Sequence, residues 1–259
     1  MEPKRIRVIT PVTGEALGNA EYVRSLGNAA TEVDLVQIER GPASIECEFE
    51  HAIAVPDTLR LIVQAEREGV DAAVVDCMAD PGVRPARELV RIPVVGPAET
   101  SMHLACLLGH QFSIVTTEER SVPEFENQAH VAGLAERLAS VRWVDIPVLD
   151  LATDPEALLA ALIDASVAAI GADGAHVIVF GCTGMLGFAE GVRDGLAARG
   201  YPGVPVLDPV PVAVRTAQAL LACGLTHSAR TWPPAPAKLI HGYGFLTDAI
   251  AGTATGPER

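Results

Sequence analysis

Aromatic and basic side chains are both scarce in this chain of 259 residues. Phe, Trp and Tyr together make up 4% of the residues, and 19 Lys and Arg stand against 33 Asp and Glu, for a formal net charge of −14. Nucleic-acid binders carry the opposite charge to hold phosphates, and many use aromatic platforms to stack bases. The composition therefore argues against a nucleic-acid partner and against an anionic membrane surface.

Long hydrophobic runs are also missing. No apolar run approaches the roughly 18 residues of a membrane-spanning helix, and the apolar stretch within residues 1–9 is too short for a signal peptide. Apolar residues nevertheless make up 49% of the chain, and the mean hydropathy is +0.28, enough to bury a sizeable core. We predict a cytoplasmic protein with no membrane partner.

The residue patterns of the common cofactors and metals are absent from the sequence. The two lysines, Lys4 and Lys238, lie near the N-terminus and in a proline-rich segment, so neither is placed to hold pyridoxal phosphate. The seven histidines show no metal-ligand spacing. Neither a P-loop nor a dinucleotide-binding glycine motif opens a helix. We predict no cofactor and no metal.

The cysteines are an odd number at wide spacings, without a C-x-x-C pair: Cys47, Cys77, Cys106, Cys182 and Cys223. This pattern argues against both a disulfide framework and a zinc cluster. A cysteine phosphatase would need an arginine six positions after its nucleophile, and neither Cys77 nor Cys182 has one. Chemistry carried by these residues should therefore be thiol chemistry of another kind.

Short β-branched segments alternate with Ala- and Leu-rich segments of helical period, a pattern typical of parallel sheets flanked by helices. The predicted strands are residues 5–9, 33–38, 72–75, 112–115, 141–146 and 176–180. The predicted helices are residues 57–68, 97–108, 154–170 and 187–198. The sequence thus predicts an α/β fold.

The two halves of the chain repeat one order of strand, cysteine, helix, X-Pro strand and helix. Residues 69–77 resemble residues 174–182, and residues 92–97 resemble residues 204–209. A period of about 105 residues exceeds that of solenoid repeats and predicts two similar lobes. Two unrelated strand–turn–helix units would produce a similar pattern, but the matching order favours duplication.

We expect the first lobe to comprise residues 1–97 and 208–259, and the second residues 98–207. The segment 232–236, Trp-Pro-Pro-Ala-Pro, is typical of a stiff extended connector. Residues 239–250 are expected to dock on the body of the protein, and residues 252–259 to fray.

Cys77 and Cys182 each come directly after a predicted strand, where α/β proteins bind their ligands. Backbone N–H groups and a helix N-terminus beyond each turn would stabilise a thiolate there. The alternative is that both cysteines are buried and inert. Their equivalent positions in the two halves of the chain make this alternative less favoured. Two thiols facing each other across a cleft would remove a proton from one face of a carbon and deliver one to the other, which is the chemistry of racemisation.

Several segments together resemble the aspartate/glutamate racemase superfamily, in particular its hydantoin racemase branch. They are residues 41–46 (GPASIE), 76–82 (DCMADPG), 112–117 (FSIVTT), 120–123 (RSVP) and 181–185 (GCTGM). The resemblance extends over residues 6–228. It implies two pseudo-symmetric α/β lobes, each with a mostly parallel sheet flanked by helices, an active site in the cleft between them, and no cofactor.

The resemblance also implies roles for single residues, with Cys77 and Cys182 as the acid/base pair. The implied substrate contacts are Val12, Thr13, Met78, Ala79, Thr116, Thr117, Thr183 and Gly184. Two threonines that end a strand are also suited to donate hydrogen bonds to a carbonyl or carboxylate, although such residues often cap a helix instead.

Two positions depart from the family pattern. Val12 stands where relatives usually carry Asn, and Ala79 where a polar residue is common. Both replacements remove side-chain hydrogen-bonding groups from the expected pocket. We therefore expect weak activity on small, simple hydantoins and a preference for a substrate with a larger apolar group.

The predicted function is that of a cofactor-independent racemase or epimerase acting on a small molecule at an acidic carbon α to a carbonyl, in a homo-oligomer. One alternative is a decarboxylase or cis–trans isomerase of the same superfamily. Decarboxylases of that type resemble this chain but keep only the later cysteine. The presence of both cysteines here therefore favours proton transfer on both faces of the substrate carbon. The other alternative is a small-molecule binding protein without catalysis, which would not need two reactive thiols.

Overall fold

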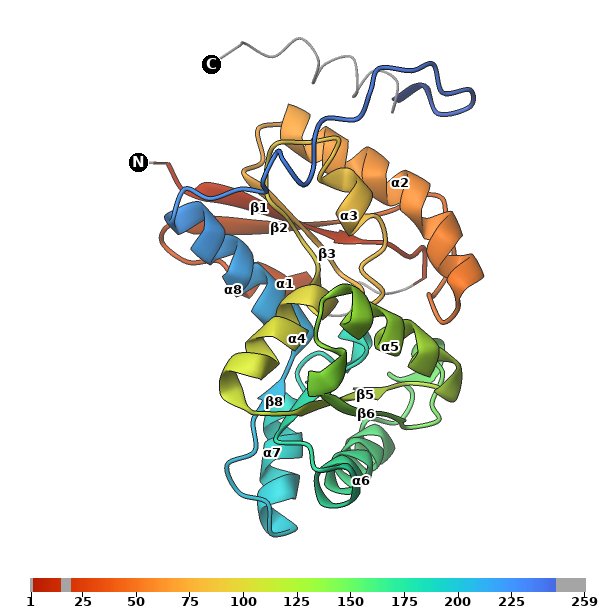
Figure 1. The fold of residues 1–259 in the computed structure, drawn as a ribbon, viewed down its shortest axis with the longest axis vertical. Helices are drawn as coiled ribbons and strands as arrows, with labels where there is room; N and C mark the ends of the chain where they lie inside the picture. Colours follow the sequence, from red (N-terminus) through yellow and green to blue (C-terminus); the bar gives the residue numbers. More distant parts are fainter. Residues whose placement is uncertain (1, 15–19, 246–259) are drawn as a thin grey trace.

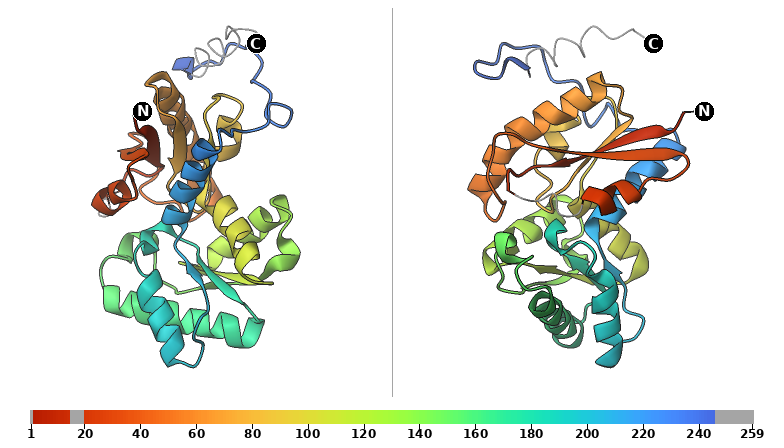
Figure 2. Two further views of the ribbon diagram at one scale, coloured as in Figure 1. Left: turned by 90° about the vertical axis from the view of Figure 1, so that its left-hand side faces the viewer. Right: turned by 180° about the vertical axis from the view of Figure 1, so that it is seen from behind.

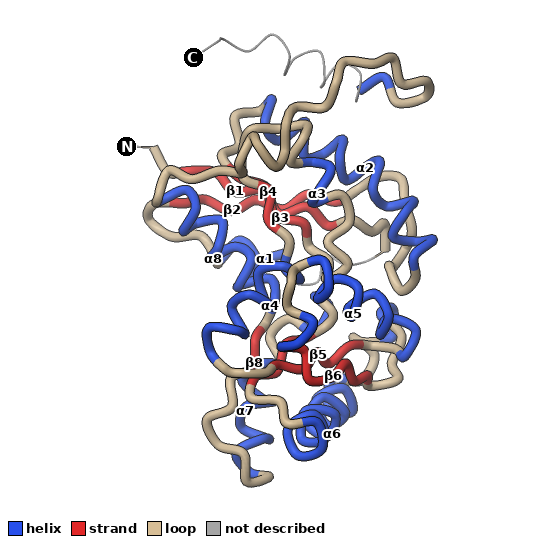
Figure 3. Tube along the Cα trace, in the orientation of Figure 1, coloured by secondary structure: helices blue, strands red, loops and turns tan. Residues whose placement is uncertain are grey.

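Two α/β lobes lie one above the other in the computed structural model, which describes residues 2–14 and 20–245 (Figures 1 and 2). Each lobe is built on a four-stranded sheet, seen as two separate groups of strands in Figure 3. The first sheet has the order β2-β1-β3-β4, from Thr31–Gln37, Lys4–Thr10, Ala72–Val75 and Val94–Val95. The second has the order β6-β5-β7-β8, from Leu138–Trp143, Phe112–Thr116, Val177–Phe180 and Val206–Leu207.

Neighbouring strands run parallel in both sheets, and helices connect them. The helices are α1 (Ala20–Ser25), α2 (Glu48–Arg67), α3 (Val83–Ala86), α4 (Pro97–Leu108), α5 (Val122–Val131), α6 (Pro155–Asp173), α7 (Ala189–Ala198) and α8 (Pro209–Ala222). Strands β3 and β7 are buried along their whole length, as the central strands of sheets covered on both faces must be. The predicted α/β fold with two parallel sheets is confirmed.

The six predicted strands are all present, with ends shifted by at most three residues. The largest difference among the helices is in α2, which begins at Glu48, well before residue 57. Pro56 suggests a helix boundary because it lacks the N–H that a helix interior needs. The helix continues through Pro56 because Ala54, Leu59 and Ile62 bury one of its sides.

Two helices carry the chain from one sheet to the other. Helix α4 follows β4 of the first sheet but packs through Ala98 and Met102 against Phe112 and Ile114 of the second lobe. Helix α8 follows β8 of the second sheet but packs against the first-lobe strands β1 and β3. The two helices also contact each other (Figure 1). The predicted lobe boundaries, at residues 97/98 and 207/208, lie at the starts of these helices.

The C-terminal segment runs over the first lobe on the side away from the second (Figure 2). Ala235 and Ile240 pack against the first-lobe core, and the Trp232 ring lies 5.0 Å from the guanidinium of Arg84. Within the segment 239–250 the predicted docking is therefore seen at Ile240, whereas Leu239 and Tyr243 are exposed. Residues 246–250, and the tail 252–259 that we expect to fray, lie outside the described residues.

Helix α6 corrects the expectation that no apolar segment reaches bilayer length. It has 19 residues and is, by length and composition alone, apolar enough to cross a membrane. In the fold it is one of the helices that cover the second sheet, in contact with β5, β6 and α7. Gly191 and Gly195 of α7 allow this close approach, since a Cβ on either would press on Leu159 or Ile163 of α6.

Candidate active site

A cavity of about 530 Å³ lies between the lobes, at the carboxyl ends of the strands. Thr10 at the end of β1 and Cys77 just after β3 line it from the first lobe. Thr116 at the end of β5 and Cys182 just after β7 line it from the second. Because parallel strands end at one edge of a sheet, the two sheet edges face each other across this space.

The two thiols occupy matching places in this cavity. The Cys77 Sγ accepts a long hydrogen bond from the N–H of Ala79 at 3.5 Å, and the Cys182 Sγ accepts one from the N–H of Gly184 at 3.4 Å. Each bond thus comes from the residue two positions further along. The structure brings together the two cysteines that the sequence placed at equivalent strand ends.

The expected stabilisation of thiolates is outweighed by burial. Burial raises the pKa of Cys77 well above its ordinary value and raises that of Cys182 to about 12, although the N–H bonds act in the opposite direction. The helix N-termini expected behind the thiols are also weak. The loop after Cys77 leads into α3, of four residues, and a single 3-10 turn, Thr183–Met185, follows Cys182. In this state both thiols are therefore held in the neutral form.

A buried carboxyl group fastens each cysteine loop to the start of a crossing helix. In the first lobe Asp80, from the loop after Cys77, accepts the N–H groups of Ala98 and Glu99 at 3.1 and 3.0 Å at the start of α4. A Cβ on Gly96 would overlap the Asp80 carboxyl group, so any larger residue there would displace that group. Burial raises the pKa of Asp80 to about 7.

The second lobe reverses this arrangement. Here the carboxyl group belongs to Asp208, the residue before α8, and it accepts the N–H of Gly187 from the loop after Cys182 at 2.8 Å. Burial raises the pKa of Asp208 to about 6. The two halves thus use opposite partners for the same loop-to-helix bond, which sequence reasoning did not identify.

Most of the expected substrate contacts line the cavity: Val12, Met78, Ala79, Thr116, Thr117, Thr183 and Gly184. Thr13 does not, because it is exposed and both its N–H and its hydroxyl bond the carbonyl oxygen of Pro42, at 2.8 and 3.1 Å. Among the described residues, the hydroxyls of Thr116 and Thr117 make no hydrogen bond to the protein. Neither is a cap, since Glu118 and Ser121 hold the cap positions of the helical segments that follow.

Asp76 is a lining residue that sequence reasoning missed. Its Oδ2 accepts a bond from the Thr10 hydroxyl at 3.4 Å, its Oδ1 is buried without a partner, and burial raises its pKa. The sequence did contain a signal for this residue: an acidic side chain follows directly after the fully apolar strand 72–75, where the apolar pattern predicts another buried hydrophobic residue.

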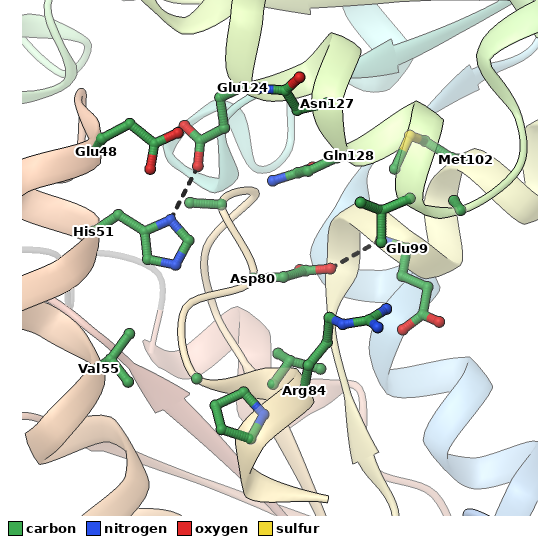
Figure 4. Close-up of a pocket in the computed structure, with 16 residues that line it drawn as sticks. Glu48, His51, Val55, Asp80, Arg84, Glu99, Met102, Glu124, Asn127 and Gln128 are labelled. Atoms are coloured by element: carbon green, nitrogen blue, oxygen red, sulfur yellow. Dashed lines mark hydrogen bonds and ion pairs between the residues drawn. The ribbon is translucent and has the colours of Figure 1, made fainter. Parts of the chain in front are cut away.

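Glu124 was also missed, and it marks the border with a second, smaller cavity of about 350 Å³ (Figure 4). Ala79 and Glu124 line both spaces. The Glu124 carboxylate in α5 lies 3.2 Å from Nδ1 of His51 in α2, and this bond raises the pKa of His51. The pair therefore joins the two lobes beside the candidate site.

Comparisons with known proteins agree with this geometry. The model of the family described as Asp/Glu/Hydantoin racemase matches residues 6–217. The chain belongs to this family. Hydantoin racemases from Pseudomonas sp. (strain NS671) and Paenarthrobacter aurescens are 36% and 37% identical over 222 and 223 residues, which cover 85% of this chain and 87% and 92% of theirs.

Solved structures of the family show the same architecture. The allantoin racemase from Klebsiella pneumoniae superposes with a TM-score of 0.85 at 32% identity, over 94% of this chain and 98% of that one. A glutamate racemase from Francisella tularensis, at 12% identity, shares the fold with a TM-score of 0.60. The family and the two-lobed fold predicted from the sequence are confirmed.

Proposed function

We propose that the protein is a cofactor-independent racemase that inverts a carbon α to a carbonyl in a neutral, hydantoin-like cyclic amide. The observation that carries the proposal is the pair of thiols, Cys77 and Cys182, at matching strand ends of one cavity. The hydantoin and allantoin racemases among its relatives support the same chemistry.

The reaction needs one thiolate and one thiol on opposite sides of the substrate. The thiolate takes the α-proton, so that an S–H bond forms as the C–H bond breaks and the electron pair moves onto the carbonyl oxygen. The opposite thiol then gives its proton to the other face of the carbon and becomes the thiolate. Charge and protons balance, and the two cysteines exchange roles for the other enantiomer.

The negative charge that develops on the carbonyl oxygen requires hydrogen-bond donors that are already in place. The Thr116 and Thr117 hydroxyls line the cavity and make no bond to other described groups, so they are free to donate. We assign substrate contacts to both threonines and to the residues after each cysteine, Met78, Ala79, Thr183 and Gly184.

The charge of the cavity favours a neutral substrate. Among the described lining residues, the charged ones are Asp76 and Glu124, both acidic. A free carboxylate, as in an amino acid or a malonate, would meet no cation there and would lose its hydration. Val12, Leu35 and Leu151 instead offer apolar walls for a substituent. This argues against both an acidic amino acid and the decarboxylase alternative.

The decisive experiment is proton NMR in D₂O with single enantiomers of 5-substituted hydantoins, allantoin and acidic amino acids. We expect the α-proton signal of neutral cyclic amides to disappear while optical rotation decays. Cys77→Ala and Cys182→Ala should each abolish racemisation, yet either variant retains exchange of the α-proton of one enantiomer. Cys47→Ala, Cys106→Ala and Cys223→Ala are the matched controls. Full racemase activity in either of the first two variants would exclude the two-thiol mechanism.

A non-catalytic binding protein remains the alternative of a different class. It would bind members of the panel without loss of any α-proton signal. The same NMR experiment, combined with a binding measurement on the same panel, therefore separates the two.

A further inference from the structure

Asp76 and Thr183 each adjoin one of the two thiols and contact each other across the boundary between the lobes. Asp76 comes directly before Cys77, and Thr183 directly after Cys182. The Thr183 hydroxyl donates to the backbone carbonyl oxygen of Asp76 at 3.3 Å. One contact thus joins the two cysteine-bearing strand ends.

The Asp76 side of this contact is firmly held. Its backbone N–H donates to the carbonyl oxygen of Ile9 at 2.8 Å, which continues the pairing of β3 with β1. The Thr10 hydroxyl holds its Oδ2 from within the same lobe. Thr183 is therefore anchored to the rigid end of a sheet rather than to a loose loop.

Other bonds also cross between the lobes. His51 pairs with Glu124, and the N–H of Val148 donates to Oε1 of Glu46 at 2.6 Å. Nε2 of Gln128 in α5 donates to the carbonyl oxygen of Met78, the residue after Cys77, at 3.0 Å. Among the described residues, the Thr183–Asp76 bond is the one that joins direct neighbours of both cysteines.

We propose that Thr183 is a positioning residue that sets the separation of the two thiols through its bond to the backbone of Asp76. This rests on the proposed function. Proton removal and delivery on opposite faces require both sulfurs to reach the same carbon, and a misplacement of about 1 Å can cost about 100-fold in rate. The contact therefore couples the two proton transfers, whereas exchange at one face needs only one correctly placed thiol.

The test measures inversion and α-proton exchange separately, in D₂O, from single enantiomers of a hydantoin that the wild type racemises. Thr183→Val removes the hydroxyl but keeps the shape of the side chain. We expect it to lower inversion about 10-fold or more beyond its effect on exchange, so that exchange with retention appears. Thr183→Ser, which keeps the hydroxyl, should restore the wild-type ratio.

Two further variants separate positioning from substrate binding and from stability. Asp76→Ala keeps the backbone carbonyl oxygen that the Thr183 hydroxyl bonds, so it should lower exchange and inversion in proportion and leave their ratio unchanged. Thr10→Val, which removes a bond to the same carboxyl from within one lobe, should lower exchange and inversion in proportion.

Equal losses of exchange and inversion in Thr183→Val, or no recovery in Thr183→Ser, would overturn the proposal. A ratio shifted as far in Asp76→Ala as in Thr183→Val would do so as well, because Asp76→Ala keeps the backbone carbonyl oxygen. A wild-type protein that exchanges no α-proton would instead contradict the proposed function itself, so the two failures are distinguishable.

Discussion

Cys77 and Cys182 are strong bases in their thiolate form, but they are rarely ionised. Burial, more than any neighbouring charge, holds both in the neutral form, and the single N–H bond that each sulfur accepts offsets only part of this effect. A thiolate of high pKa, once formed, is well matched to a weakly acidic C–H bond. The rate then depends on how often one thiolate is present.

This predicts a rate that rises with pH. Below a pKa of about 12, the thiolate fraction of Cys182 grows about tenfold per pH unit. We expect kcat/KM to increase across about pH 7 to 10 for the enantiomer from which Cys182 removes the proton. Initial rates from each enantiomer, measured separately, check this. A plateau near neutral pH would mean that a group of lower pKa is the base.

Val12 is the residue at which specificity should respond to a single change. It lines the cavity at a position where the family resemblance led us to expect Asn, and a neutral hydrogen bond contributes about 0.5–1.5 kcal/mol. Val12→Asn should therefore raise kcat/KM for a polar cyclic amide, relative to an apolar competitor, by about 2- to 12-fold. Thr13→Asn is the matched control, since Thr13 lies outside the cavity. An unchanged ratio in Val12→Asn would remove Val12 from the specificity argument.

At the scale of elements, each cysteine loop depends on the helix that crosses to the other lobe. Asp80 joins the Cys77 loop to α4, and Asp208 joins the Cys182 loop to α8. Each of these helices packs on the opposite lobe, so the position of each thiol-bearing loop depends on the position of the other lobe. The bonds of Asp80 to α4 depend on space as well as on charge, because Gly96 has no side chain and leaves room for the Asp80 carboxyl group.

Gly96→Ala tests this link. The added methyl group would displace the Asp80 carboxyl from the two N–H groups of α4, and overpacking of this kind costs about 1–3 kcal/mol. We expect a lower thermal midpoint and a loss of racemase activity. Gly244→Ala, at a position with open space around it, should change neither. Wild-type stability and activity in Gly96→Ala would show that the Asp80 bond is dispensable.

At the scale of the whole molecule, the lobes are held together by α4 and α8 and by contacts at the edge of the cleft. The His51–Glu124 pair is such a contact, and its bond raises the pKa of His51 above that of a free histidine. Its contribution to stability is thus fully present below about pH 6.5 and is lost as the pH rises through the raised pKa.

Replacing His51 should therefore matter at acidic but not at alkaline pH. We expect His51→Gln to lower the free energy of unfolding by about 1 kcal/mol near pH 6 and to have little effect near pH 9. Urea unfolding at both pH values measures this. His130→Gln, on the exposed face of α5, is the control. An equal loss at both pH values would mean that His51 acts through packing and not through its charge.

Self-association of the two-lobed unit stays a prediction. Light scattering coupled to gel filtration tests it directly, and a single species of monomer mass would contradict it.

The sequence by itself determined the elements and the chemistry of single positions. Buried central strands have near-continuous apolar sequences, so the strands 72–75 and 176–180 were predicted almost to the residue. The duplicated order of elements placed Cys77 and Cys182 at equivalent strand ends. Because strand ends of parallel sheets are where ligands bind, the candidate thiols followed from local pattern alone.

Only the tertiary structure decided how these positions act together. The high pKa of the thiols comes from burial between two lobes, the Asp76–Thr183 and His51–Glu124 contacts join residues far apart in the chain, and Thr13 faces Pro42 instead of the cavity. Such properties depend on desolvation and on distances across the cleft. Local sequence patterns determine neither the desolvation nor these distances, because both arise only when separate segments of the chain pack against each other.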